Sequence, residues 1–312
     1  MILVSDKDAS LVYHIVVPTI DARASRYSER ADITARSLLV TVFGDSIAPA
    51  GGKIWIGDLI KLIKPFSFSD RLVRTSVFRL GADGWFDTER IGRRSRYSLS
   101  ATARLEFEAA DRRIYYPPAD NWDNEWTIVF ANENELDDTG KAAFARALRW
   151  QGFGRLAAGV FASPTAAPDA VGSAAARVGL TVPLPIARAR FDDLGTLLHR
   201  ESFSADFGLD ESAEAYETFL DAWKWFKTVD TDDGNAAFLV RSMMVNDFRR
   251  ARLADPELPK PLLPANWSGG AAYERAAEIF HEVDGAASEY LAAEWSLVSP
   301  STDRFAPRQT GK

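Results

Sequence analysis

The sequence contains 312 residues, with a hydrophobic share of 46%, a formal net charge of −7 and no cysteine. A chain of this length is expected to form two or three domains, and it has enough apolar residues for a sizeable core. The missing cysteine excludes disulfides, thiolate metal sites and cysteine nucleophiles, and it is typical of a cytoplasmic protein. No apolar run is long enough to span a membrane, and the N-terminus lacks the pattern of a secretion signal.

The charge is unevenly distributed along the chain. Residues 34–104 contain twelve lysines and arginines against six acidic residues, so this segment carries +6 and the remainder carries −13. A basic segment on an acidic body keeps the attraction for phosphates local and limits non-specific binding. The distribution therefore indicates a nucleic-acid-binding module within an acidic protein.

Residues 1–33 are predicted to be an N-terminal extension without a functional signal. They are polar apart from residues 11–20, which could form one short strand or a loose arm. The pattern then changes, because apolar residues recur at helical spacing in 34–45 and again in 54–63. Proline and glycine residues break the chain between these two segments, so two amphipathic helices are expected.

A third helix is predicted over residues 69–82. Ser69 and Asp70 suit an N-cap and a first-turn acid. At 100° per residue the apolar positions gather on one face of the helix. The polar residues on the other face are Arg71, Arg74, Thr75 and Arg79. Phe78 also projects among these outward residues, where it could pack against the hairpin that follows.

A basic hairpin is predicted after this helix, with strands over 85–90 and 95–99 and a turn at 91–94. Three helices followed by a basic hairpin are typical of a winged helix-turn-helix, here residues 34–104, which places its third helix in the major groove. The expected DNA contacts are Ser69, Arg71, Arg74, Thr75 and Arg79 in the helix and Arg93, Arg94, Ser95, Arg96 and Tyr97 in the wing. The alternative is a solvated helix and an ordinary hairpin.

The rest of the chain is predicted to hold a linker and two more domains. Residues 105–122 are expected to form a linker helix, although a dimerisation helix would have the same pattern. Residues 208–300 follow a helical pattern throughout, and 301–312 form a polar tail. Together with the segment between them, these features predict an α+β fold with an all-helical C-terminal domain.

Residues 123–207 alternate between strand and helix patterns. Strands are expected at 125–131, 155–162 and 194–198, and helices at 138–151 and 168–178. Alternation of this kind is typical of a small α+β sandwich.

Three blocks of the sequence resemble one known family. They are the GDS-to-GGKIW block at 44–55, the GRRS-x-Y wing at 92–97 and the DPELPKPLLPANWSG block at 255–269, and WDNEWTIV at 122–129 is also similar. In this order they resemble the PaaX family, the repressors of phenylacetic acid degradation operons, from about residue 35 to about residue 290.

The resemblance implies a homodimeric transcriptional repressor that binds double-stranded operator DNA. It implies an N-terminal winged helix, a middle ferredoxin-like domain similar in shape to the CRISPR-associated Cas2 fold, and a helical C-terminal domain. It also implies that DNA is released when an aryl-coenzyme A thioester, such as phenylacetyl-CoA, binds.

The densest basic cluster outside the winged helix comprises Arg249, Arg250 and Arg252. Because the implied thioester carries phosphates, we expect these arginines and Trp267 to hold its coenzyme A part. The alternative is a set of ion pairs with nearby acidic residues, notably Asp247 and Asp255.

Residues 42–47 also resemble the first block of GDSL-type esterases, in which the serine, here Ser46, is the nucleophile. Those enzymes need an aspartate three residues before a histidine, and none of His14, His199 and His281 has one. The segment is therefore expected to cap and turn the chain, and a serine esterase is the alternative function.

A nuclease and a metal site are not expected either. Cas2-type nucleases hold a metal ion with an aspartate on the first strand, and residues 126–130 contain none. Three scattered histidines give no metal-ligand spacing. The sequence therefore predicts a protein without enzymatic activity, metal or cofactor.

Overall fold

The computed structural model describes residues 18–117, 122–132, 137–180, 184–193, 203–228, 233–299 and 304–305. The chain divides into two compact units. Unit 1 combines residues 1–104 with 229–243 and 282–300, and unit 2 combines residues 105–228 with 244–281 and 301–312. The predicted α+β fold is confirmed. The C-terminal helices, which the sequence suggested as one domain, contribute residues to both units.

Unit 1 contains the N-terminal helices and a small sheet. Its elements are α1 (Ile20–Tyr27), α2 (Ala35–Val42), the π-helix η1 (Phe43–Ile47), β1 (Lys53–Trp55), α3 (Ile56–Leu62), the 3-10 helix η2 (Lys64–Phe66), α4 (Asp70–Ala82), β2 (Phe86–Ile91) and β3 (Arg94–Leu99). Parts of α11 (Gly234–Ala254) and α12 (Gly269–Trp295) complete it. The predicted three helices and hairpin are present. Helix α1 was not predicted, and residues 11–17 of the suggested strand or arm lie outside the described residues.

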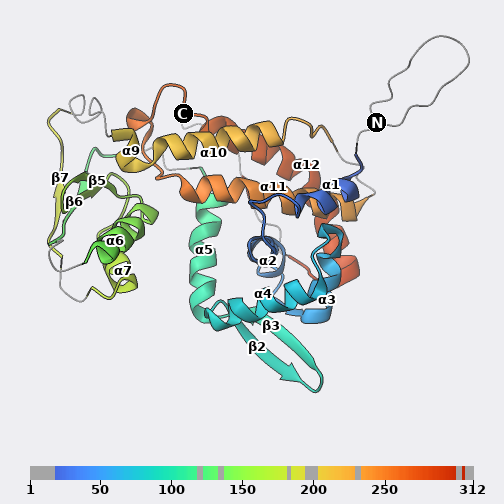
Figure 1. Ribbon diagram of the computed structural model, residues 1–312. Coiled ribbons are helices and arrows are strands. Elements are labelled where there is room, and N and C mark those ends of the chain that lie inside the picture. Colours follow the sequence, from blue (N-terminus) through green and yellow to red (C-terminus); the bar gives the residue numbers. More distant parts are fainter. Residues whose placement is uncertain are drawn as a thin grey trace, which may run out of the picture. The chain divides into compact units, whose positions relative to one another are not determined.

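The hairpin forms a three-stranded antiparallel sheet in the order β1-β3-β2, and β2 and β3 project as a ribbon (Figure 1). The turn is shorter than predicted. Ile91 pairs with Arg94, so only Gly92 and Arg93 form it, and Gly92 supplies the positive φ of 61° that a tight turn requires. Arg94 therefore lies in a strand. Strand β1 was not predicted, because three residues directly before a helix are too few to show a strand period.

The apolar face of α4 holds this helix against the rest of unit 1. Val73, Val77 and Leu80 are buried, as the helical spacing predicts. Helix α4 contacts α2, whose Leu38 and Leu39 are also buried. Because one face of α4 is fixed in this way, the opposite face is left to solvent.

A buried arginine links the C-terminal helices of unit 1 to its N-terminal part. The guanidinium of Arg241 in α11 is 4% exposed, lies 2.9 Å from the carboxylate of Asp45 and 2.8 Å from that of Asp284 in α12, and donates to Ser46 Oγ at 3.0 Å. Asp45 and Ser46 belong to η1, whose Phe43 stacks on Phe86 at the base of the hairpin, with ring centroids 4.1 Å apart. A charge so far from water is stable only with such partners. The expectation that this segment only caps and turns the chain is therefore incomplete.

Unit 2 contains a four-stranded antiparallel sheet in the order β5-β6-β4-β7. Its strands are β4 (Trp126–Phe130), β5 (Gly154–Ala157), β6 (Val160–Ser163) and β7 (Ile186–Ala189). The predicted single strand over 155–162 is wrong, because Gly159, at φ 70°, turns the chain into a second strand. Strand β7 was missed, since most of its residues are exposed and show no alternation. The strand predicted at 194–198 lies outside the described residues.

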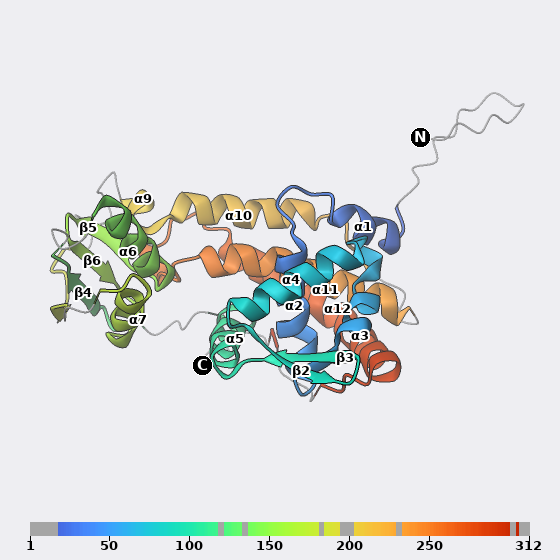
Figure 2. The same cartoon turned by 60° about the horizontal axis from the view of Figure 1, so that its bottom comes forward.

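Helices cover both faces of this sheet. Val129 and Phe161 pack against α6 (Asp138–Trp150) and α7 (Asp169–Arg177), which lie side by side against the strands (Figure 2). On the opposite face Trp126 packs against Phe207 of α9 (Phe203–Phe207) and against Leu258. The predicted small α+β sandwich is thus confirmed.

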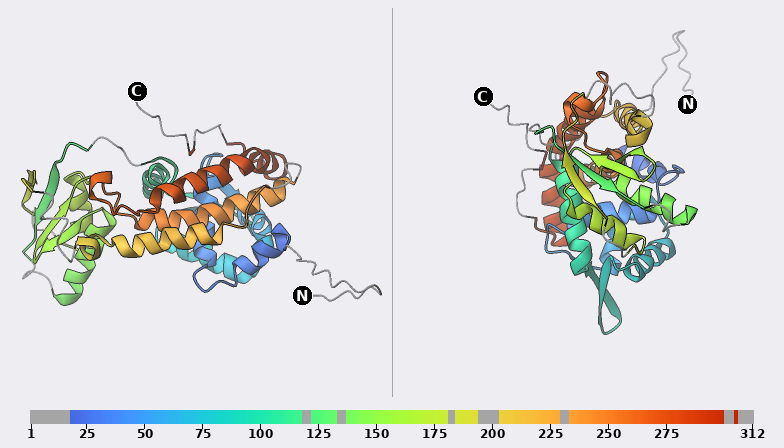
Figure 3. Two further views of the ribbon diagram at one scale, coloured as in Figure 1. Left: turned by 90° about the horizontal axis from the view of Figure 1, so that it is seen from above. Right: turned by 90° about the vertical axis from the view of Figure 1, so that its left-hand side faces the viewer.

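Unit 2 also holds α5 (Ala101–Tyr115) from Leu105 onward, α10 (Leu209–Ala222), the second half of α11 and the first half of α12, with the 3-10 helix η4 (Lys260–Leu262). Helix α10 runs beside this part of α11 (Figure 3). Trp223 Nε1 donates to Asp247 at 3.1 Å, and Tyr216 donates its hydroxyl proton to Asp255 at 2.7 Å. The aromatic residues of these helices therefore belong to the core.

The Arg241 cluster leads to a stability prediction. Arg241→Met should lower the free energy of unfolding by about 3–5 kcal/mol, because it leaves buried Asp45 without its counter-charge. Urea unfolding of the purified chain measures the change.

The matched control is Arg30→Met, which removes the ion pair between Arg30 and Asp32, two side chains that are both partly exposed. This variant should lower the free energy of unfolding by about 1 kcal/mol or less. Equal losses for the two variants would show that the buried cluster does not stabilise unit 1.

Candidate nucleic-acid interface

Helix α4 starts at an N-cap that fixes its first turn. The hydroxyl of Ser69 accepts a hydrogen bond from the backbone N–H of Leu72 at 3.3 Å, and Asp70 supplies the predicted acid in the first turn. The side chain of Ser69 therefore serves the helix itself. Its place at the N-terminus still leaves it beside any phosphate that approaches there.

The outward face of α4 carries the predicted cations. Arg71, Arg74, Thr75 and Arg79 are all exposed. Within the part of the chain that the structure describes, none of the three guanidinium groups has an ion-pair partner. Thr75 differs, because its hydroxyl donates to the carbonyl of Arg71 at 2.8 Å. The face thus offers three charges that can bind phosphates or base edges without first breaking an internal contact.

The wing arginines are arranged around one tryptophan. The guanidinium of Arg94 lies over the ring of Trp55 at 4.2 Å, and that of Arg96 lies 5.6 Å from the same ring. Trp55 is directly opposite Arg96 in the β1–β3 register. Cation–π contacts of this kind hold the charges in place without neutralising them. The missed strand β1 is therefore part of the candidate interface, because it supplies the tryptophan.

Two acidic residues also contact the wing arginines. Arg96 is 2.6 Å from Glu89, its cross-strand neighbour, and Arg94 is 3.9 Å from Asp58. The hydrogen bond from Arg96 and its positive charge lower the pKa of Glu89, so this carboxylate stays ionised. A DNA phosphate would compete with Glu89 for Arg96. Arg93, in the turn, has no ion-pair partner among the described residues.

The remaining predicted wing residues, Ser95 and Tyr97, lie on the other face of β3 and are half-buried. Tyr97 is opposite Ile54 and Thr88 in the sheet register, and Ile54 is buried. This position fits the expectation that the tyrosine ring anchors the wing. The structure thus brings together the helix and wing residues on one unit, with Arg94 and Arg96 on the opposite side of β3 from Tyr97.

The alternative nucleophile, Ser46, is placed poorly for catalysis. It is 2% exposed, donates its hydroxyl proton to Asp45 at 3.0 Å and accepts from Arg241. A serine esterase needs an accessible hydroxyl next to a general base. The geometry therefore makes Ser46 a partner of the buried arginine.

The three arginines of α11 that were predicted to bind the effector differ in their exposure to solvent. Arg252 is 3% exposed and lies 2.6 Å from Glu257 and 3.5 Å from Asp255, so the ion-pair alternative holds for this residue. Arg250 is exposed and Arg249 half-buried, and a helix turns about 200° between residues 250 and 252. Trp267 packs edge-on against Tyr216, with ring centroids 5.8 Å apart. The three arginines therefore do not form one surface.

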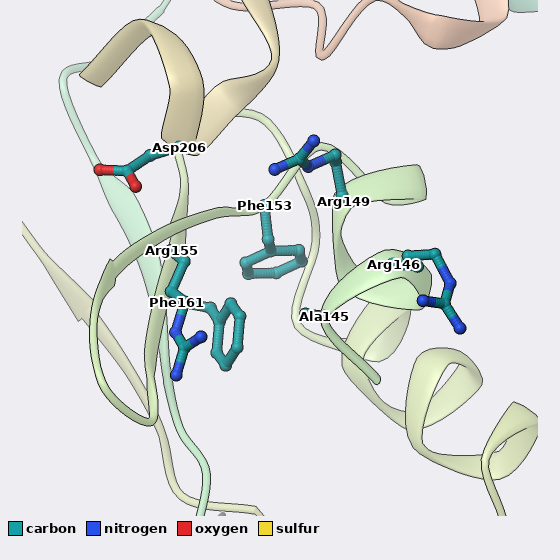
Figure 4. A pocket seen from close by; sticks show the side chains of 7 residues that line it. All are labelled: Ala145, Arg146, Arg149, Phe153, Arg155, Phe161 and Asp206. Carbon is teal, nitrogen blue, oxygen red and sulfur yellow. The ribbon is translucent and has the colours of Figure 1, made fainter. Parts of the chain in front are cut away.

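A shallow pocket in unit 2 was not predicted. It has a volume of about 250 Å³ and is lined by Ala145, Arg146, Arg149, Phe153, Arg155, Phe161 and Asp206 (Figure 4). Arg149 donates to the carbonyl of Ala205 at 3.3 Å, and Arg155 lies 5.9 Å from the Phe161 ring. Its residues come from α6, from the β5–β6 hairpin and the residue just before it, and from α9, so no local pattern in the sequence marks it. Three arginines in the lining suit a small anion, the carboxylate of Asp206 opposes one, and the rings of Phe153 and Phe161 are buried in the core.

Two further features bear on the class of protein. Within the described ranges no helix is both long and apolar enough to cross a membrane. The same residues contain no group of three or more histidine, aspartate or glutamate side chains that could hold a metal ion.

Comparison with known proteins matches most of the chain. Three family profiles cover it in order: PaaX-like protein over residues 34–103, PaaX protein central Cas2-like domain over 119–198, and PaaX-like protein C-terminal domain over 207–293. The Transcriptional repressor PaaX of Escherichia coli strain K12 is 32% identical over 273 residues, which is 83% of each chain. Among solved structures, the uncharacterized Mycobacterium tuberculosis protein Rv0674 aligns with a TM-score of 0.47 and 21% identity, over 81% of this chain and 98% of that one.

The wing geometry predicts how binding depends on salt. Replacing both Arg93 and Arg94 by alanine should weaken binding to every duplex by similar factors, because these side chains are expected to contact phosphates and not bases. The slope of log K against log salt should flatten by up to about two. Fluorescence anisotropy at several salt concentrations measures it, with Arg93→Lys/Arg94→Lys as the charge-retaining control. An unchanged slope in the alanine variant would exclude a phosphate contact by the wing.

Replacement of Glu89 is predicted to strengthen DNA binding, whereas replacement of the wing arginines is predicted to weaken it. Glu89→Gln should release Arg96 for a phosphate, so that affinity for any duplex rises and the salt slope steepens by up to about one. The same anisotropy titrations test it. Weaker binding by this variant would mean that Glu89 positions Arg96 rather than competing for it.

Proposed function

The chain belongs to the PaaX family, and on that premise we propose that it is a transcriptional repressor which binds operator DNA through α4 and the β2–β3 wing. The name of its E. coli relative and the profiles that match all three segments support this function. The observation that carries it is the outward face of α4, where three arginines without ion-pair partners in the described residues stand in one helix next to a basic wing.

The charge distribution supports the same proposal. A segment of +6 on a body of −13 attracts the DNA backbone at one place and repels it elsewhere. We propose that the protein acts as a homodimer in the cytoplasm, so that two copies of α4 read two half-sites of one operator. No enzymatic activity is part of this proposal, since Ser46 is buried and its hydroxyl is engaged.

We further propose that the regulated operon serves the degradation of an aromatic acid such as phenylacetate, and that an aryl-CoA thioester such as phenylacetyl-CoA relieves repression. Relief requires a ligand that binds the free repressor more tightly than the DNA-bound one. By linkage, that ratio equals the factor by which the ligand weakens operator binding.

Two basic surfaces of unit 2 are candidates for the phosphates of this thioester. One is the surface around Arg249 and Arg250 on α11, without the buried Arg252. The other is the pocket of unit 2 that Arg146 and Arg155 help to line. Variants of the two surfaces distinguish them.

The recognition helix is tested by the contrast between specific and random DNA. Arg74→Ala should cost about 1–3 kcal/mol at the operator and much less on random duplexes, because Arg74 lies near the N-terminal half of α4, the part that meets base edges. The operator is first selected from a pool of random duplexes with the unaltered protein. Equal losses on both kinds of DNA would make Arg74 a backbone contact.

Effector binding is tested by isothermal titration of phenylacetyl-CoA into the free protein and into its operator complex, with coenzyme A as control. Phenylacetyl-CoA should bind the free protein more tightly than the operator complex. The ratio of the two affinities should equal the factor by which the ligand weakens operator binding. Loss of binding in Arg249→Ala/Arg250→Ala places the phosphates on α11, and loss in Arg146→Ala/Arg155→Ala places them in the pocket. No binding by the unaltered protein would remove this effector and leave the repressor proposal standing.

A further inference from the structure

Phe78 lies in the middle of the exposed face of α4, where an apolar side chain is unexpected. Its side chain is 72% exposed, the most of any large apolar residue in the described part of the chain. The sequence left open that Phe78 packs against the wing, and this exposure rules that out. At 100° per residue it projects within about 60° of Arg71, Arg74 and Thr75. Phe78 therefore belongs to the same surface as the predicted DNA contacts.

Thr75 makes the centre of this face less polar still. Its hydroxyl donates to the carbonyl of Arg71 within the helix, so the proton is not available to a ligand, and its methyl group remains on the exposed side chain. The centre of the face thus consists of a phenyl ring and a methyl group, and the cations of Arg71, Arg74 and Arg79 lie around it. A partner for this surface must be anionic at its rim and carry an apolar group at its centre.

The major groove of DNA fits this description with one base. Its edges are phosphates, and the C5-methyl of thymine is the one apolar group that natural bases present there. A phenyl ring against the amino group of cytosine or adenine would remove that donor from water without replacing its hydrogen bond. We propose that Phe78 contacts the C5-methyl of a thymine and thereby selects thymine at one position in each half-site. This inference rests on the proposed function, since it needs α4 in the major groove.

The experiment uses deoxyuridine, which differs from thymidine by the missing methyl group alone. An operator is selected from random duplexes with the full-length protein, and each thymine is then replaced singly by deoxyuridine. Substitution at one position per half-site should weaken binding by about three- to tenfold, a loss that matches removal of one buried methyl group. Phe78→Ala should bind the thymine and deoxyuridine duplexes equally well at that position.

Leu72→Ala is the matched control, because Leu72 is also an exposed apolar residue of α4 but lies away from the centre of the face. This variant should retain the preference for thymine. Phe78→Leu should retain part of it, since leucine is smaller but still apolar. Circular dichroism of the variants checks that the helix content is unchanged, as expected for a side chain that is mostly exposed.

Three outcomes would overturn the inference. If no thymine in the selected operator shows a methyl effect, Phe78 does not read thymine, although the proposed function stands. If Phe78→Ala retains the methyl effect but lowers the mass measured by light scattering, the phenyl ring belongs to a contact between copies of the chain. If the unaltered protein selects no duplex at all, the proposed function fails together with the inference.

Discussion

The buried charge of Arg241 is the constraint on which unit 1 depends. A guanidinium that is 4% exposed must have carboxylates beside it, and here they come from Asp45 in η1 and Asp284 in α12. The π-helical turn of η1 directs two contacts at once, because Phe43 in the same segment stacks on Phe86 at the root of the wing. Five consecutive residues thus connect the C-terminal helices of unit 1 to the β2–β3 hairpin, and a shift of η1 would act on both.

The orientation of α4 is set by the burial of its apolar face in unit 1. Its buried stripe includes Val73, Val77 and Leu80, and a helix fixed on one side can present only the opposite side. The arginines on the outward face of α4 are therefore placed by hydrophobic burial, not by contacts of their own, and they remain available for a ligand. The same burial places Phe78 outside, so its exposure is a consequence of helical geometry and carries the cost of hydrating a phenyl ring.

Local patterns predicted what local physics decides. The spacing of apolar residues gave the extent and orientation of α4, and the turn glycine and alternation gave the hairpin. Local patterns could not predict contacts between residues that are far apart in the sequence. Arg241 and Asp45 are 196 positions apart, and nothing in the sequence around either residue indicates that the two form an ion pair. The prediction for Arg252 was wrong for a related reason, because three arginines within four residues look like one cluster in sequence, whereas a helix turns one of them into the core. Short elements such as β1 were also not predicted, since three residues are too few to show the alternation of a strand.

On the proposed function, affinity and specificity are divided between the wing and the helix. The wing arginines that stack on Trp55 each have a carboxylate near them, so a phosphate that binds Arg96 must displace Glu89, and the net gain in affinity is reduced. The acidic body lowers affinity for random DNA further. A repressor must find its operator among a genome of competing sites, so the ratio of specific to non-specific binding matters more than affinity itself. If the wing binds phosphates as proposed, internal competition there lowers the sequence-independent part of the binding energy, and discrimination would then rest on the groups that α4 presents to the bases.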